Sequence, residues 1–309
     1  MPQVKFDPQR IPRKKTVSII AGFKCYEGIV ICADTQETAG TSKRSVPKLR
    51  FEPARGPHEG DGLAVAFCGA GDNGAFIDKL VQTAWEDGQL GTSLDEACEE
   101  IEKSIKRTYK EFGQIYQVGY CPNADLIYGV KMLGACRLFS ARGPVVNEKS
   151  EYDSFGTGYY MADFLASRMY AHHLNLRQCA ILAAYILFQA KEHVEECGGD
   201  NHIAVLREEG VSGVSDWKHV EAMTECLKMA DRYVGEVLID AADIGLESKE
   251  FLKKNKNVLE IIDSLRSVQV EDLKQHRSMV LAFTGAKDKE MDFFGLPLPS
   301  EPETPEADS

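Results

Sequence analysis

The chain has 309 residues, of which 43% are hydrophobic, and its formal net charge is -12. This length is sufficient for one globular unit with a sizeable core, plus extensions. The acidic surplus argues against nucleic acid as the main partner, because phosphate binding needs clustered Lys and Arg. No apolar stretch of the sequence is long enough to cross a bilayer, and the first residues lack an apolar secretion core. We therefore expect a cytoplasmic protein without nucleic-acid or membrane partners.

The cysteines and histidines do not form a recognisable ligand pattern. The nine cysteines are odd in number and are never spaced as a CxxC pair, which argues against both a disulfide framework and a zinc site. The histidines share no ligand spacing, and residues 69–74 lack the lysine of a phosphate-binding P-loop. We predict neither a metal site nor a cofactor.

The first predicted element is a β-hairpin over residues 16–33. Polar and apolar residues alternate over residues 16–21, which is typical of a strand with two different faces. A turn is predicted at residues 26–28. Residues 29–33 are continuously apolar, as in a strand buried on both faces, and the run ends at Asp34. A carboxylate at this place needs a partner.

Strand pairs and helix pairs then follow in alternation. An apolar strand is predicted over residues 63–67, and two helices over 77–85 and 93–112, the second opened by a capping box at Ser93 and Glu96. A strand hairpin over 124–141 precedes two more helices over 159–170 and 175–196, and a last hairpin begins at residue 202. This order predicts an α+β fold in which two antiparallel sheets face each other and helices cover the outer faces.

The remainder of the chain is predicted to be helical and then disordered. Apolar residues at helical spacing recur over residues 217–238 and 251–265, so we expect a helical extension over 214–296 that packs on the core or covers a subunit interface. Residues 297–309 are acidic, rich in proline and almost devoid of apolar groups, so a disordered acidic tail is expected.

Several short motifs in chain order resemble the proteasome superfamily, which comprises the β-type subunits and related bacterial ring proteases. They are the hairpin that ends at Asp34, the residues Thr38 and Gly40, the pair Lys48 and Leu49, the glycine-bracketed loop 154–158 and the turn 197–201. The resemblance covers residues 16–211. It implies the four-layer αββα sandwich of the N-terminal nucleophile (Ntn) hydrolases, with residues 1–15 as an N-terminal arm or propeptide and residues 16–213 as the domain.

The resemblance also implies a catalytic mechanism. In this family the hydroxyl of an N-terminal threonine is the nucleophile and its own α-amino group is the base. An α-amino group titrates at about 7.7–8.0, whereas an amide nitrogen does not accept a proton. The family spacing from Asp34 leads to Ser18, and Thr16 is a second candidate. The alternative is that both are ordinary strand hydroxyls in a retained arm, because Val17 stands where self-processing members usually have glycine.

The supporting residues match the family in part. Asp34 and Lys48 correspond to its aspartate and catalytic lysine, and Thr157 stands in place of a serine. Val194 and Cys197 replace an aspartate and a second serine of the family. At Cys68 and Gly69, in the expected oxyanion region, we predict that a backbone N–H group is retained as a hydrogen-bond donor to the oxyanion.

These observations support two main hypotheses for function. The first is a proteasome-like β-type subunit of a homo-oligomeric ring with a degenerate or absent peptidase site. The alternative is a self-processing hydrolase, a threonine- or serine-type peptidase that takes part in intracellular proteolysis. A third interpretation is an amide-cleaving relative that acts on a small molecule. The expected partners are copies of the chain, with an ATP-dependent unfoldase or an α-type ring as further candidates.

Overall fold

The computed structural model describes residues 18–39, 42–54, 62–115, 122–209, 212–215, 217–242, 247–253 and 255–256. Several predictions fall outside these residues. They concern Thr16, the arm over residues 1–15, most of the second extension helix and the acidic tail over 297–309. In the described part, no helix is long and apolar enough to span a membrane.

One five-stranded antiparallel sheet carries the predicted N-terminal hairpin. Its strand order is β10-β1-β2-β11-β12. The strands are β1 (Ile20–Cys25), β2 (Gly28–Asp34), β10 (Tyr152–Phe155), β11 (Asn201–Arg207) and β12 (Gly213–Val214). The central position of β2 brings Asp34, at its end, opposite Asn201 of β11. A residue there is surrounded by protein on every side.

The second five-stranded sheet has the order β5-β6-β7-β8-β9. Its strands are β5 (Leu49–Glu52), β6 (Ala64–Gly71), β7 (Ala124–Met132), β8 (Ala135–Arg142) and β9 (Val145–Lys149). The predicted hairpin over 124–141 is confirmed, with Leu133 and Gly134 both at positive φ in its turn. A small ribbon of β3 (Gln36–Ala39) and β4 (Ser42–Ser45), which the sequence did not predict, connects the two sheets along the chain.

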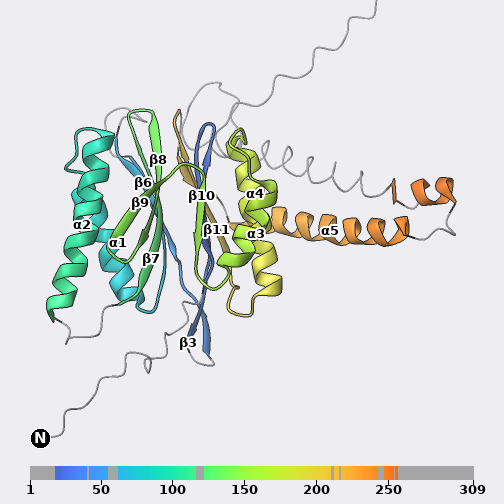
Figure 1. Ribbon diagram of the computed structural model, residues 1–309, viewed down its shortest axis with the longest axis horizontal. Coiled ribbons are helices and arrows are strands. Elements are labelled where there is room, and N and C mark those ends of the chain that lie inside the picture. Colours follow the sequence, from blue (N-terminus) through green and yellow to red (C-terminus); the bar gives the residue numbers. More distant parts are fainter. Residues whose placement is uncertain are drawn as a thin grey trace, which may run out of the picture.

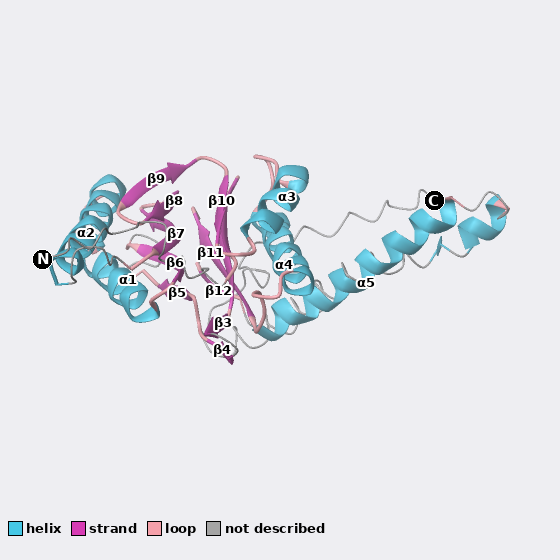
Figure 2. Cartoon of the chain, turned by 60° about the horizontal axis from the view of Figure 1, so that its bottom comes forward, coloured by secondary structure: helices cyan, strands magenta, loops and turns pink. Residues whose placement is uncertain are grey.

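Helices cover the outer face of each sheet (Figure 1). The helices α1 (Gly74–Gly88) and α2 (Leu94–Ile115) pack on the second sheet through one apolar cluster. The helices α3 (Tyr159–Met169), α4 (Leu176–His193) and the first turns of α5 (Trp217–Ala241) pack on the first sheet through another. A third apolar cluster lies between the two sheets, which therefore face each other. Figure 2 shows the same arrangement from below.

The hairpin strand β1 is buried on both faces, so the prediction of two different faces was wrong. Gly22 faces the second sheet so closely that a Cβ there would lie 2.6 Å from Cγ2 of Ile127. Phe23, on the opposite face, belongs to the cluster under α4. Both faces are buried because the strand lies between a second sheet and a helix layer. Among the described residues the ladder begins at Ile20, and residues 16 and 17 of the predicted strand lie outside them.

Two helices depart from their predicted form at the ends. The capping box of Asn175 and Gln178 at the start of α4 is confirmed, but the helix ends at His193, three residues early, because Val194 adopts an extended conformation. Helix α5, which occupies part of the predicted extension, projects from the body (Figure 1). Its distal residues Leu238 and Ile239 are 67% and 74% exposed.

Candidate active site

The site is built around the carboxylate of Asp34, which is fully buried. Its Oδ1 accepts hydrogen bonds from Ser18 Oγ at 3.0 Å and from the backbone N–H of Ile19 at 3.1 Å. Lys48 Nζ lies 2.5 Å from the same oxygen, and the Gly198 N–H donates to Oδ2 at 2.9 Å. Four donors from three segments of the chain thus compensate the cost of burying this charge.

Lys48 lies on the short segment that joins β4 to β5. Its Nζ donates to the carbonyl of Gln36 as well as to Asp34. Burial lowers the pKa of Lys48, because the ammonium group loses its water, and the negative charge of Asp34 acts in the opposite direction. A buried cation that touches both the carboxylate and a main-chain carbonyl can stabilise negative charge that forms nearby.

The loop at residues 156–158 holds the backbone of Ser18. The carbonyl of Ser18 accepts a hydrogen bond from the Gly158 N–H at 3.0 Å. Gly156 has a φ of +92°, and a Cβ there would lie 2.3 Å from the Ser18 carbonyl oxygen. Only glycine fits such a close approach in this backbone region. Thr157 lies between the two glycines, so the structure places this predicted site residue next to Ser18 in the fold.

The turn after α4 places an apolar side chain and a thiol on this side of the site. Val194 is buried and belongs to the apolar cluster under α4. Cys197 is also buried, and desolvation, followed by the nearby charge of Asp34, raises the pKa of its thiol to about 12. Glu195, which follows Val194, is exposed. This side of the site therefore presents a methyl-bearing side chain and a neutral thiol instead of an ionised acid.

The sequence analysis missed two contributors to the site. Gly198 was noted only as part of a turn, although its N–H binds the carboxylate of Asp34. Thr35 was not singled out. Its Oγ1 accepts hydrogen bonds from Ser45 Oγ at 2.9 Å and from the Asp200 N–H at 2.7 Å. Thr35 thus connects the segment that leads to Lys48 with the turn that carries Gly198.

One N–H of the predicted oxyanion region, that of Gly69, is engaged within the fold. It donates to the main-chain carbonyl of Lys48 at 3.2 Å, next to the pairing between β5 and β6. The prediction of a backbone donor at Cys68 and Gly69 does not specify which N–H would serve, and it stays a prediction. The pattern alone could not show the Gly69 hydrogen bond, because the segment over Leu49–Glu52 was not recognised as a strand next to β6.

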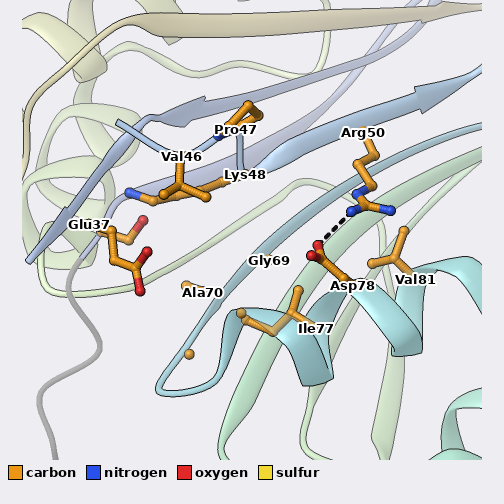
Figure 3. A pocket seen from close by; sticks show the side chains of 13 residues that line it. Glu37, Val46, Pro47, Lys48, Arg50, Gly69, Ala70, Ile77, Asp78 and Val81 are labelled. Carbon is orange, nitrogen blue, oxygen red and sulfur yellow. Dashed lines mark hydrogen bonds and ion pairs between the residues drawn. The ribbon is translucent and has the colours of Figure 1, made fainter. Parts of the chain in front are cut away.

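A pocket of about 80 Å³ is lined by Ser18 and Lys48; Figure 3 shows Lys48 and the labelled residues around it. It lies between the segment 46–50 and the start of α1, with the end of β6 between them. The remaining lining residues are Glu37, Val46, Pro47, Arg50, Gly69, Ala70, Gly71, Gly74, Ile77, Asp78 and Val81. A hydroxyl, an ammonium group and a partly apolar pocket therefore meet at one place, which is the arrangement of a covalent-catalysis site.

The sequence matches no protein-family model and no curated protein. The two facing sheets with helices on their outer sides do have counterparts among solved structures.

The solved structures with this fold include Anbu proteins from three bacteria. A mutant of Anbu from Hyphomicrobium sp. strain MC1 has a TM-score of 0.57 at 15% identity, covering 71% of this chain and 96% of its own. Anbu from Yersinia bercovieri, described as an ancestral β-subunit, has a TM-score of 0.56 at 16% identity and coverages of 74% and 99%. A helical assembly of the Anbu complex from Pseudomonas aeruginosa gives 0.56 at 13% identity, with coverages of 71% and 95%. At these identities the similarity shows the fold.

Proposed function

We propose that this chain is a proteasome-like β-type subunit that assembles with copies of itself and hydrolyses peptide bonds with Ser18 as nucleophile. One observation carries the proposal. The hydroxyl of Ser18 and the ammonium group of Lys48 share one oxygen of the buried Asp34, and both line a pocket. This is the arrangement that the αββα sandwich of the N-terminal nucleophile hydrolases would need.

Each group of the cluster has a physical task in this reaction. Lys48 places a positive charge beside Ser18, which favours the alkoxide form of the nucleophile. Asp34 keeps Lys48 charged in spite of burial and orients the hydroxyl of Ser18. The proton of the hydroxyl requires a base, and the amide nitrogen of Ser18 is not basic. Hydrolysis of the bond between Val17 and Ser18 would convert that amide into an α-amino group that titrates at about 7.7–8.0.

Assembly with copies of the chain is supported by the fold. The Pseudomonas aeruginosa neighbour is described as a helical assembly of its complex. The exposed distal part of α5 and the exposed aromatic residues of α3 provide surface for such contacts in this chain. An ATP-dependent unfoldase or an α-type ring would serve as a further partner that supplies unfolded chains.

A second candidate function is a subunit without hydrolase activity. It is favoured by Val194 and Cys197, which are buried and uncharged where the family has an acid and a hydroxyl. In this case the Asp34 and Lys48 pair would serve the fold only, as buried ion pairs can.

Intact mass and peptide hydrolysis, measured on the same preparations, separate these candidates. We expect the purified chain to begin at Ser18 and to hydrolyse fluorogenic peptides. The Ser18→Ala variant should keep the preceding residues and lose hydrolysis. Thr16→Ala is the matched control and should behave as wild type. Hydrolysis that persists in Ser18→Ala would refute Ser18 as the nucleophile. A wild-type chain that keeps residues 1–17 and hydrolyses nothing would refute the proposal and favour the second candidate.

A further inference from the structure

The pocket beside Ser18 has a reactive end and an outer end that an ion pair bridges. Lys48 lies at the reactive end (Figure 3), and Ser18, another lining residue, shares one oxygen of Asp34 with it. At the other end Arg50 of β5 reaches across to Asp78 of α1, with Nη2 and Oδ1 2.6 Å apart. Both side chains are about half exposed, at 44% and 58%, so the ion pair lies at the surface of the pocket. It joins the two walls across the outer opening.

The wall on the α1 side is apolar and firmly seated. Ile77 and Val81, four residues apart, lie on one face of the helix. Ile77 packs directly on β6, since a Cβ on Gly69 would lie 2.4 Å from its Cγ2 and a Cβ on Gly71 would lie 3.0 Å from its Cδ1. The two glycines make room for this contact. Val46 lies on the opposite wall.

The size of the pocket limits what it can hold. Its volume is about 80 Å³. An apolar protein cavity that binds benzene has a volume of roughly 150 Å³. The pocket therefore encloses less space than an aromatic ring fills, and a short aliphatic side chain matches it better.

The charged groups that line the pocket are already paired. Arg50 is paired with Asp78, Lys48 with Asp34, and Glu37 with Arg44. A charged ligand group would have to compete with one of these pairs or lose its water without compensation. An uncharged side chain avoids this cost.

We propose that the pocket selects peptides with a short aliphatic side chain, of the size of Ala or Val, next to the scissile carbonyl. Arg50 and Asp78 set this selectivity by closing the outer end and neutralising each other. The inference rests on the proposed function, since Ser18 must be the nucleophile for the neighbouring pocket to hold that side chain.

The ion pair gives two predictions of opposite sign. Asp78→Asn leaves Arg50 without its partner, so peptides with Glu at the tested position should gain about threefold to fivefold, the range expected of an exposed charge pair. Arg50→Gln leaves Asp78 unpaired, so peptides with Lys should gain by the same factor. The matched controls Arg107→Gln and Asp87→Asn disrupt a 2.5 Å ion pair between α1 and α2 outside the pocket, and should leave the ranking unchanged.

The test uses five peptides that differ only at this position, carrying Ala, Val, Phe, Lys or Glu. Fluorogenic forms report kcat/KM, and N-acetyl peptide amides report binding to the same protein by titration calorimetry. Wild type should prefer Ala and Val at least tenfold over the other three. Cleavage without this preference, or variants that do not shift in opposite directions, overturns the selectivity but leaves the proposed function intact.

A third outcome is that the peptides bind with the aliphatic preference but are not cleaved. It supports the pocket assignment and refutes the peptidase. If the peptides are neither bound nor cleaved, the pocket assignment is overturned directly, because the binding measurement does not depend on turnover.

Discussion

The two sides of the candidate site differ in polarity. On one side, Asp34 and Lys48 form a buried ion pair with further donors from Ser18, Ile19 and Gly198. On the other, the turn after α4 brings Val194 into an apolar cluster and leaves Cys197 as a neutral thiol. Both sides lie next to the same loop at residues 156–158, where the Gly158 N–H donates to the Ser18 carbonyl and the Gly158 backbone lies beside the Cys197 thiol.

This difference shows what holds each side together. The ion pair is fixed by backbone groups and by Thr35, so loss of one charge would leave the other buried and unpaired. Position 194 is not constrained in this way. Its neighbours are apolar, so the buried valine gains hydrophobic contacts there and leaves no charge unpaired. Four predictions follow from this contrast, from the largest expected effect to the smallest.

Removal of the cation should have the largest effect. Lys48→Met leaves Asp34 buried beside a neutral side chain, and we expect the free energy of unfolding to fall by about 3–5 kcal/mol. Urea denaturation provides the measurement. Lys103→Met, on an exposed ion pair of α2, is the control and should leave the midpoint unchanged. If both variants had the same urea midpoint, the ion pair of Lys48 and Asp34 would not stabilise the fold.

The loop beside Ser18 allows a second comparison. Gly143 and Gly156 both have positive φ, but only Gly156 has the Ser18 carbonyl where a Cβ would go. Gly143→Ala should cost about 1–2 kcal/mol from the backbone conformation. Gly156→Ala should cost about 1–3 kcal/mol more from the overlap. Thermal unfolding of both variants tests this, and equal losses would show that the loop is free to move away from Ser18.

The apolar side of the site can be tested by restoring an acid. Val194→Asp places a carboxylate in a cluster of apolar side chains, so we expect a loss of stability beyond that of Val194→Ala by about 1–3 kcal/mol. Peptide hydrolysis should not rise. A stable Val194→Asp protein with faster hydrolysis would instead show that the turn accepts an acid and that both sides of the site are functional.

The smallest effect concerns pH. Burial lowers the pKa of Lys48, whereas the pairs with Glu100 and Glu99 raise that of Lys103. Carbon NMR of labelled lysines should therefore show Lys48 titrating at lower pH. Between this pKa and the unfolded value of about 10.4, the unfolded chain binds more protons, so the Lys48 contribution to the free energy of unfolding increases with pH. If Lys48 titrates above Lys103, the assignment of burial as the dominant cause is wrong.

The sequence predicted those parts of the site that depend on local pattern. The apolar run into Asp34, the spacing to Lys48 and the glycine-bracketed loop were visible, and the structure brings these residues to Ser18. The strand hairpin over 124–141 and the start of α4 were also predicted, because turn and capping residues act locally.

Features that depend on pairing across the fold were not predictable. The use of the Gly69 N–H by Lys48 requires the register of β5 against β6. The pair of Arg50 and Asp78 joins residues 28 positions apart. Burial of both faces of β1 follows from the second sheet, and one strand's pattern carries no information about what packs above it.

The most direct test of the account is covalent labelling of the nucleophile. The purified protein is treated with a peptidyl phosphonate bearing Val next to phosphorus, and the adduct is located by mass spectrometry of proteolytic fragments. The account predicts one adduct, on the hydroxyl of Ser18, that is absent in Ser18→Ala. An adduct on another residue, or none at concentrations that label a known serine peptidase, would contradict it.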